Sequence, residues 1–314
     1  MADRLLLRRS LQAIFVIAIL WFGGRLLAQQ WEAVRELRAT LDPSWTRIGF
    51  SGLIVLASYA VLIATWRGTV QAWGSRIDVL DAARIWFVSN LGRYIPGKVW
   101  QIGAMGVMAQ RVGVSPVAAV GSALVVSLVH VLVGFAVVAG TGRELLAGTA
   151  PSGLLLPVAL VALGAGVLLA PWLLPPGVRL LARLTGRPLE MPALPPRAIW
   201  IAALGSAAAW LLFGLAFREL AVGLLGAATG DASAYIAVFT LSYLLGFLAL
   251  FAPGGIGIRE LSMAALLVSA GLSTAPEAAL LVVASRLWLT VLEILPGALF
   301  LVWPSLRPTP SSPS

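Results

Sequence analysis

The charged residues most able to bind a ligand or do chemistry stand next to two Pro-Gly breaks in apolar sequence. Lys98, the one lysine of the chain, directly follows the Pro-Gly at 96–97, and Arg259 comes about one turn after the Pro-Gly at 253–254. A break exposes the first N–H groups of the following helix, which lack partners within the helix and carry the positive end of its dipole. Such a helix start favours anions. The sequence therefore predicts two anion sites inside apolar segments.

Other ionisable residues in apolar segments form a second group of candidates, because charge inside a membrane is costly and by default functional. Arg286 and Glu293 are seven residues apart, two turns along one helix face, and His130 is the one histidine. All three are candidates for gating or proton transfer, since imidazole titrates near neutral pH. Structural roles stay open: a hydrogen-bonded His130, pairing of Arg286 with Glu260 or Glu293, and a locally neutral pair of Arg259 with Glu260.

Interfacial roles also remain open for the cations of the first break. Lys98 can extend its ammonium group toward the membrane surface. Arg93 can serve as an interfacial anchor beside Tyr94 and Trp100. These readings would leave the first break without a binding role.

The composition requires these residues to be positioned by membrane-spanning helices. Of the 314 residues, 60% are hydrophobic and 11% are charged, and the mean hydropathy is +0.95. Soluble domains have about 25% charged residues. Apolar stretches of about 20 residues recur, each long enough to cross a hydrocarbon core of roughly 30 Å. This excludes a soluble enzyme, a nucleic-acid-binding module and a disordered protein, and it predicts an all-α polytopic membrane protein.

Six apolar stretches predict full spans, and two others are interrupted. The interrupted segments run over about 82–111 and from 232 through the break at 253–254. Proline removes a backbone donor and disfavours helix in the preceding residue, so each interrupted segment should form two short arms. A re-entrant or tightly broken helix pair is expected. The full spans are expected at about 11–28, 48–66, 115–140, 152–174, 198–220 and 276–303.

The order of these elements repeats along the chain. Aligning the Pro-Gly at 96–97 with that at 253–254 gives an offset of 157 positions, and one further position aligns Gly-Val-Ser at 113–115 with Gly-Leu-Ser at 271–273. Each half then has two spans, a broken pair and a third span. Three net crossings per half make the second half inverted relative to the first, as in many transporters. Ordinary kinks in a structural bundle are the alternative.

The predicted organisation is one transmembrane domain over residues 1–303, built from two inverted repeats. Each repeat has three spanning helices plus one Pro-Gly-broken, re-entrant helix pair, the first over about 10–140 and the second over about 152–303. A Pro/Ser-rich tail at 304–314 is expected to be disordered and cytoplasmic.

The net charge and the absence of known catalytic motifs further limit the functions that this sequence can have. The net charge of +9 reflects arginines gathered in segments expected to lie inside, which places both termini in the cytoplasm and the chain in the cytoplasmic (inner) membrane. The chain has no cysteine, which excludes disulfides and, with a single histidine, disfavours a transition-metal site. It contains no Gly-rich phosphate loop, Ser-His-Asp set or other soluble catalytic motif. We expect no enzyme activity, no cofactor and no nucleic-acid partner.

Two segments, SNLGRYIPGKVWQ at 89–101 and FAPGGIGIRE at 251–260, resemble the lysylphosphatidylglycerol synthase transmembrane-region family of flippase-like proteins. The resemblance covers about residues 10–303. In the best-known members this region moves an aminoacylated phospholipid between leaflets, and a separate cytoplasmic domain makes that lipid. Other members accompany glycosyltransferases or isoprenoid-lipid pathways. No synthase domain follows here, so the resemblance implies translocation without aminoacyl transfer.

Carried over by position, the resemblance implies binding residues at both breaks. They are Arg93, Tyr94, Pro96, Gly97, Lys98 and the nearby Gln101 at the first, and Pro253, Gly254, Gly255, Gly257, Arg259 and Glu260 at the second.

The leading hypothesis is a lipid translocase that works by alternating access. Its expected partners are membrane lipids with an anionic, glycosylated or isoprenoid-phosphate head group, together with a lipid-modifying enzyme or glycosyltransferase. Two other functions remain open. One is a non-transporting partner of a glycosyltransferase or lipid synthase, and the other is a small-solute or ion transporter.

Overall fold

The described part of the protein is entirely helical. A computed structural model describes residues 42–91, 99–142, 165–166, 169, 195–249, 255 and 257–302. Within these residues the chain forms eight helices and no strand, and four helices are long and apolar enough to cross a membrane. The four long helices are α3 (Trp45–Ala72), α6 (Pro116–Thr141), α10 (Pro196–Leu225) and α13 (Ala275–Val302).

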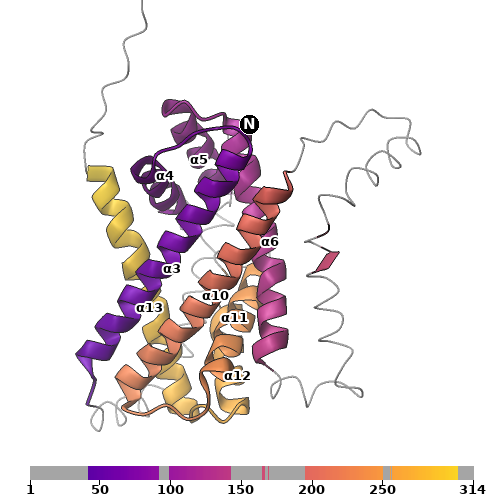
Figure 1. The fold of residues 1–314 in the computed structure, drawn as a ribbon. Helices are drawn as coiled ribbons and strands as arrows, with labels where there is room; N and C mark the ends of the chain where they lie inside the picture. The colour runs from indigo at the N-terminus through magenta and orange to yellow at the C-terminus, as the bar shows by residue number, and fades with distance from the viewer. Residues whose placement is uncertain are drawn as a thin grey trace, which may run out of the picture.

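The other four helices are short and come in two consecutive pairs. In Figure 1, α4 and α5 lie together at one end of the bundle, whereas α12 lies near the opposite end. Each pair stands between two long helices in the sequence. The bounds are α4 (Val79–Leu91) and α5 (Val99–Arg111) for the first pair, and α11 (Ala232–Leu248) and α12 (Ile258–Ser269) for the second.

These helices confirm the all-α prediction and the positions of four expected spans. The stretches expected at 48–66, 115–140, 198–220 and 276–303 coincide with α3, α6, α10 and α13. The expected spans at 11–28 and 152–174 lie outside the described residues, as does the tail at 304–314.

Local sequence explains where several helices begin and end. Both α6 and α10 start with proline, Pro116 and Pro196, at a position where a missing N–H group costs nothing. Gly113 follows α5 with a φ of +78°, and Gly271 follows α12 with a φ of +65°. Glycine adopts this left-handed conformation without steric penalty. The short pairs therefore turn tightly into the long helices that follow them.

The centre of the bundle is the crossing of α3 and α10, which pack more extensively than any other two described helices (Figure 1). Small residues let the two backbones approach, as is common between membrane helices. Gly205 of α10 faces the side chain of Thr65, and a Cβ added at Gly68 of α3 would lie 3.0 Å from Ile201. At the other end of the crossing, a Cβ at Gly223 would lie 3.0 Å from Ile48. The two helices are therefore antiparallel.

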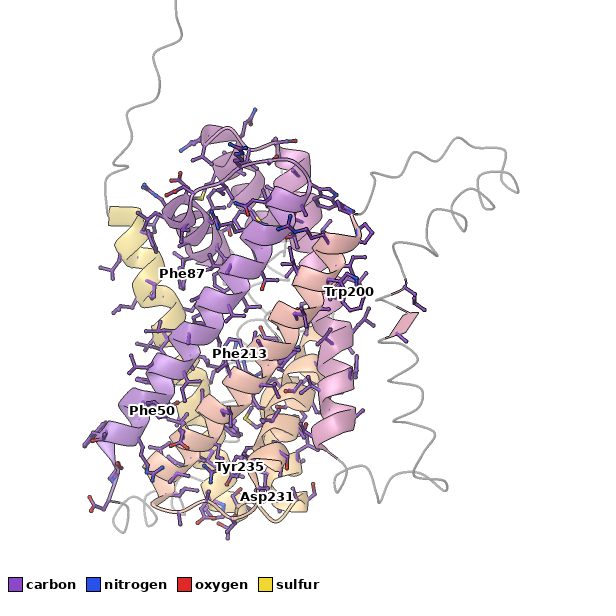
Figure 2. All side chains as sticks on the ribbon, viewed as in Figure 1. Phe50, Phe87, Trp200, Phe213, Asp231 and Tyr235 are labelled. Atoms are coloured by element: carbon purple, nitrogen blue, oxygen red, sulfur yellow. The ribbon has the colours of Figure 1, made fainter. Side chains whose placement is uncertain are left out.

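Side chains around this crossing separate into a packed interior and an apolar exterior. Phe87, Phe213 and Tyr235, which Figure 2 labels, belong to the buried core. Large apolar side chains such as Leu204 and Leu287 remain exposed on the outer faces of α10 and α13. An apolar exterior of this kind suits contact with lipid tails.

We predict that Gly214→Ala destabilises the protein, whereas Gly49→Ala does not. A Cβ at Gly214 would lie 2.5 Å from the backbone Cα of Ile236 on α11, so α10 and α11 would have to separate. Such overpacking typically costs about 1–3 kcal/mol. Gly49 of α3 has nothing within 4 Å of that position, so alanine there should be neutral or stabilising. Thermal unfolding in detergent measures both effects, and equal unfolding midpoints for the two variants would contradict this packing.

Candidate functional site

Arg259 is a buried cation at the start of α12. It is the second residue of that helix, and only 7% of it is exposed. The carbon atom of its guanidinium group lies 4.9 Å from the ring centroid of Tyr243 and 5.4 Å from that of Phe239, both on α11. Within the described residues its Nη2 atom has no hydrogen-bond partner. The aromatic faces hold the cation, and at least one charged donor remains available.

Glycines bring α11 and the start of α12 together at this point. A Cβ at Gly246 of α11 would lie 2.7 Å from the Cβ of Arg259, so no larger residue fits there. Gly255 and Gly257 have φ values of +69° and +89°, in the left-handed region that favours glycine. The two predicted motif glycines therefore shape the turn that leads into α12 and set Arg259 against the rings of α11.

Glu260 fixes the start of α12 and contacts α13. Its Oε2 atom accepts a hydrogen bond of 2.6 Å from the N–H group of Gly257, which is the glutamate half of a capping box. Its Oε1 atom lies 3.6 Å from Nη1 of Arg286 on α13. Of the two pairings that the sequence left open for Arg286, the structure has the one with Glu260.

The local pair of Arg259 with Glu260, which the sequence left open, is not formed among the described residues. The carboxylate of Glu260 is directed to Gly257 and Arg286, and no ion pair to Arg259 occurs among the described residues. Adjacent positions on a helix point about 100° apart, so neighbours in sequence do not face each other. The guanidinium group of Arg259 therefore packs against aromatic rings and not against a carboxylate.

A connected series of aromatic rings runs from α4 to this arginine. Tyr59 of α3 lies 5.4 Å from Trp86 of α4 and 5.6 Å from Phe213 of α10, measured between ring centroids. Phe213 stacks on Phe239 with ring centroids 5.9 Å apart, and the guanidinium group of Arg259 lies over the ring of Phe239. These aromatic residues were not among those predicted from the sequence. The spacing of four residues between Phe239 and Tyr243, on one helix face just before a Pro-Gly break, was a usable signal.

At the first break the structure describes the two arms and not the residues between them. Gln101 on α5 donates a hydrogen bond from Nε2 to Oδ1 of Asn90 on α4, which joins the arms next to the break. Asn90 is buried and was not among the predicted residues. The remaining predicted binding residues of both breaks lie outside the described part of the chain; they are Arg93, Tyr94, Pro96, Gly97, Lys98, Pro253 and Gly254.

Glu293 is a second buried charged residue, with 3% exposure. It lies on α13, which packs against α4. One turn further along the same face, a Cβ at Gly297 would lie 3.0 Å from Leu91, the last residue of α4. Glu293 is therefore on the part of α13 that faces the first short pair, whereas Arg286 faces the second pair through Glu260.

His130 of α6 is held by ring stacking. Its imidazole lies parallel to the indole of Trp210 on α10, with centroids 4.3 Å apart. The Nε1–H group of Trp210 donates to the backbone carbonyl of His130 at 2.8 Å. The expected hydrogen bond to the ring is not found at Nδ1 among the described residues. Trp210 also contacts Tyr243, so His130 is connected to Arg259 through two rings.

Comparison with known protein families finds one whose model matches this chain. The model of the lysylphosphatidylglycerol synthase TM region matches residues 10–297 of this chain. The match includes both short pairs, Arg259 and its aromatic neighbours. A search of curated proteins found no match.

We predict that Glu260→Ala is more destabilising than Glu260→Gln. Alanine removes both the acceptor for the Gly257 N–H group and the contact with Arg286, while glutamine keeps an acceptor oxygen for the cap. Loss of a cap costs about 1 kcal/mol. Thermal unfolding in detergent checks the order of the three proteins. If alanine and glutamine lowered the midpoint equally, the carboxylate would contribute only through Arg286.

Proposed function

Because this chain belongs to the lysylphosphatidylglycerol synthase transmembrane-region family, we propose that it is a lipid translocase rather than an enzyme. Its substrate is a lipid with a phosphate-bearing or glycosylated head group, including isoprenoid phosphates, which it moves between the leaflets of the cytoplasmic membrane. The head group passes between the short helix pairs, close to Arg259, and the tails stay in the bilayer.

The observation that carries this proposal is the buried guanidinium group of Arg259. In a low-dielectric interior an anion gains far more from a cation than it does in water. Arg259 contacts aromatic faces, and no carboxylate pairs with it in the described residues, so an incoming phosphate would be its first anionic partner. The free N–H groups at the start of α12 add to this attraction. Lys98 and Arg93 would supply the corresponding charge at the first break.

Charged residues next to Arg259 suit a gate. The 3.6 Å contact between Glu260 and Arg286 joins α12 to α13, and both side chains are partly exposed. A phosphate bound at Arg259 would attract Arg286 away from Glu260 and loosen this contact. Glu293 and His130 are the candidates for coupling such a movement to a proton.

Alternating access would follow from two inverted repeats, and the order of helices supports this part of the proposal. A long helix, two short ones and a long one occur in α3–α6 and again in α10–α13. The first short helices of the two halves, α4 and α11, start 153 positions apart, at Val79 and Ala232. Ile48 and Ile201 are separated by the same 153 positions, and each packs on a glycine at the α3–α10 crossing.

The contacts between the halves are reciprocal in the same way. The first short helix of each half packs against the last long helix of the other half: α4 against α13, and α11 against α6. A rocking motion of one half would therefore move the short pair of the other. This exchange of partners supports a mechanism in which the two breaks open in turn.

Charge at the two ends of the bundle supports the proposed orientation. Arg67, Arg76, Arg84, Arg111 and Arg197 lie at the end where α3 finishes and α6 and α10 begin, and Asp78 and Asp81 are there too. At the other end acidic residues predominate; they are Asp42, Glu219, Asp231 and Glu277, against Arg47 and Arg218. By the positive-inside rule the first end is cytoplasmic.

We predict that single cysteines at the two ends react from opposite sides of the membrane. Since the natural chain has no cysteine, Gln110→Cys and Asp231→Cys each introduce one exposed thiol. An impermeant maleimide should label Gln110→Cys from the cytoplasmic side and Asp231→Cys from the outside. Labelling of both from one side would contradict the orientation and the inverted arrangement.

We predict that Arg259→Gln slows lipid movement at least roughly tenfold, because it removes a charge-assisted contact in a buried site. Purified protein in liposomes is tested by leaflet-selective quenching of labelled anionic, glycosylated and isoprenoid-phosphate lipids. Arg47→Gln is the matched control, since Arg47 pairs with Glu219 at an exposed end of α3. A folded wild-type protein that moves none of these lipids faster than empty liposomes would overturn the translocase and favour a non-transporting partner protein.

A further inference from the structure

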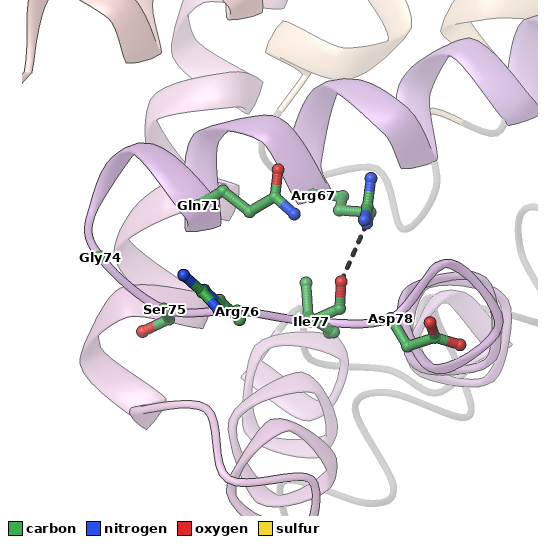
Figure 3. Close-up of a pocket in the computed structure, with 7 residues that line it drawn as sticks. All are labelled: Arg67, Gln71, Gly74, Ser75, Arg76, Ile77 and Asp78. Atoms are coloured by element: carbon green, nitrogen blue, oxygen red, sulfur yellow. Dashed lines mark hydrogen bonds between the residues drawn. The ribbon is translucent and has the colours of Figure 1, made fainter.

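A polar pocket lies outside the Arg259 site, where the loop between α3 and α4 folds back along the end of α3. Its volume is about 650 Å³. Arg67 and Gln71 line it from α3, and Ser75, Arg76 and Asp78 line it from the loop (Figure 3). In Figure 3 the side chain of Gln71 points toward Arg67 along the space between helix and loop, and that of Arg76 runs toward Gly74 and Ser75. The carboxylate of Asp78 points away from Gln71 and Arg76.

The backbone around this pocket is well defined by hydrogen bonds. Arg67 donates from Nε to the carbonyl of Ile77 at 2.9 Å, which fixes the guanidinium group at the pocket without using its terminal nitrogens. The N–H groups of Trp73, Gly74 and Ser75 bond to carbonyls at the end of α3. These bonds reduce the negative potential that a helix C-terminus would otherwise present to an anion. Arg67 therefore holds a fixed position at the pocket, whereas Arg76 is exposed and makes no hydrogen bond within the described residues.

The depth of the pocket relative to the membrane is set by its neighbours. It lies at the end of spanning helix α3, where Trp73 packs against α6 close to Gly121. Tryptophan is common at the level of lipid head groups. The first turn of α4 begins directly after Asp78, beside the pocket. Phosphate groups of lipids are found at this same depth.

Topology alone does not account for this arrangement. The positive-inside rule explains arginines at this end of the bundle, but it does not require two of them and an amide to line one pocket. The corresponding loop of the other half, residues 226–231, carries no arginine, and Thr229 closes it by donating to the carbonyl of Leu272. The pocket and its charges are thus specific to the first half.

We propose that this pocket binds the phosphoryl group of an anionic ligand at the membrane surface, as a site separate from Arg259. Two guanidinium groups and a side-chain amide match the several acceptor oxygens of a phosphate. The phosphoryl group can belong to an anionic lipid or to a soluble phosphate ester, and the experiment distinguishes these sources.

The test measures retention of phosphatidylglycerol by the purified full-length protein in native mass spectrometry, with phosphatidylcholine as the comparison lipid. The variants are Arg76→Gln and the double variant Arg67→Gln/Arg76→Gln. Arg76 makes no hydrogen bond within the described residues, so Arg76→Gln keeps the loop intact even if loss of Arg67 disturbs it. We expect phosphatidylglycerol affinity to fall several-fold in the single variant and roughly tenfold or more in the double variant.

The matched control is Arg111→Gln/Arg197→Gln, which removes the same charge from the same end without touching the pocket. It should retain phosphatidylglycerol like the wild type. Loss of the lipid signal on adding sn-glycerol 3-phosphate would identify a soluble phosphate ester as the ligand, and an unchanged signal would identify the lipid head group. Equal retention by wild type, pocket variants and control would overturn the proposal, as would equal weakening by pocket and control variants.

Discussion

The structure depends on how one buried guanidinium group is accommodated in an apolar helical bundle. Arg259 is nearly inaccessible, yet the nearest carboxylate in sequence, Glu260, is directed elsewhere. Its charge is met by the faces of Phe239 and Tyr243. These contacts are weaker than a carboxylate would provide, and a charged donor remains for a ligand. A fully paired arginine would stabilise the bundle more and bind an anion less.

The rest of the bundle serves to hold this arrangement in place. Glycines at the α3–α10 crossing and at Gly246 bring helix axes close enough for the aromatic side chains to form one connected series around Arg259. Because α4 packs on α13 and α11 packs on α6, each short pair is held by the other half of the chain. The proposed movement of the two breaks is thus linked to the same contacts that position the charge. Stability and the proposed function would therefore depend on the same set of helix contacts.

Much of this organisation could be predicted from the sequence because it depends on local sequence patterns. Apolar length predicted the four described long helices, and Pro-Gly breaks predicted two short arms in each interrupted segment. The sequence also singled out Arg259 by its distance to a break, and the structure shows that this residue is buried. The pairing of Arg286 with Glu260 and the ring stacking of His130 on Trp210 could not be predicted, because they depend on how different helices pack. Spacing along one helix cannot specify which neighbouring helix a side chain faces.

The central claim is that the guanidinium group of Arg259 is a binding group for a lipid phosphate. Electron cryomicroscopy of the protein in nanodiscs that contain the lipid it transports tests this most directly. The account predicts phosphate density within hydrogen-bonding distance of Nη2 of Arg259, with the lipid tails reaching the bilayer between helices. An Arg259 whose nitrogens all bond to backbone carbonyls of the protein, with lipid excluded from its surroundings, would contradict it and make the residue structural.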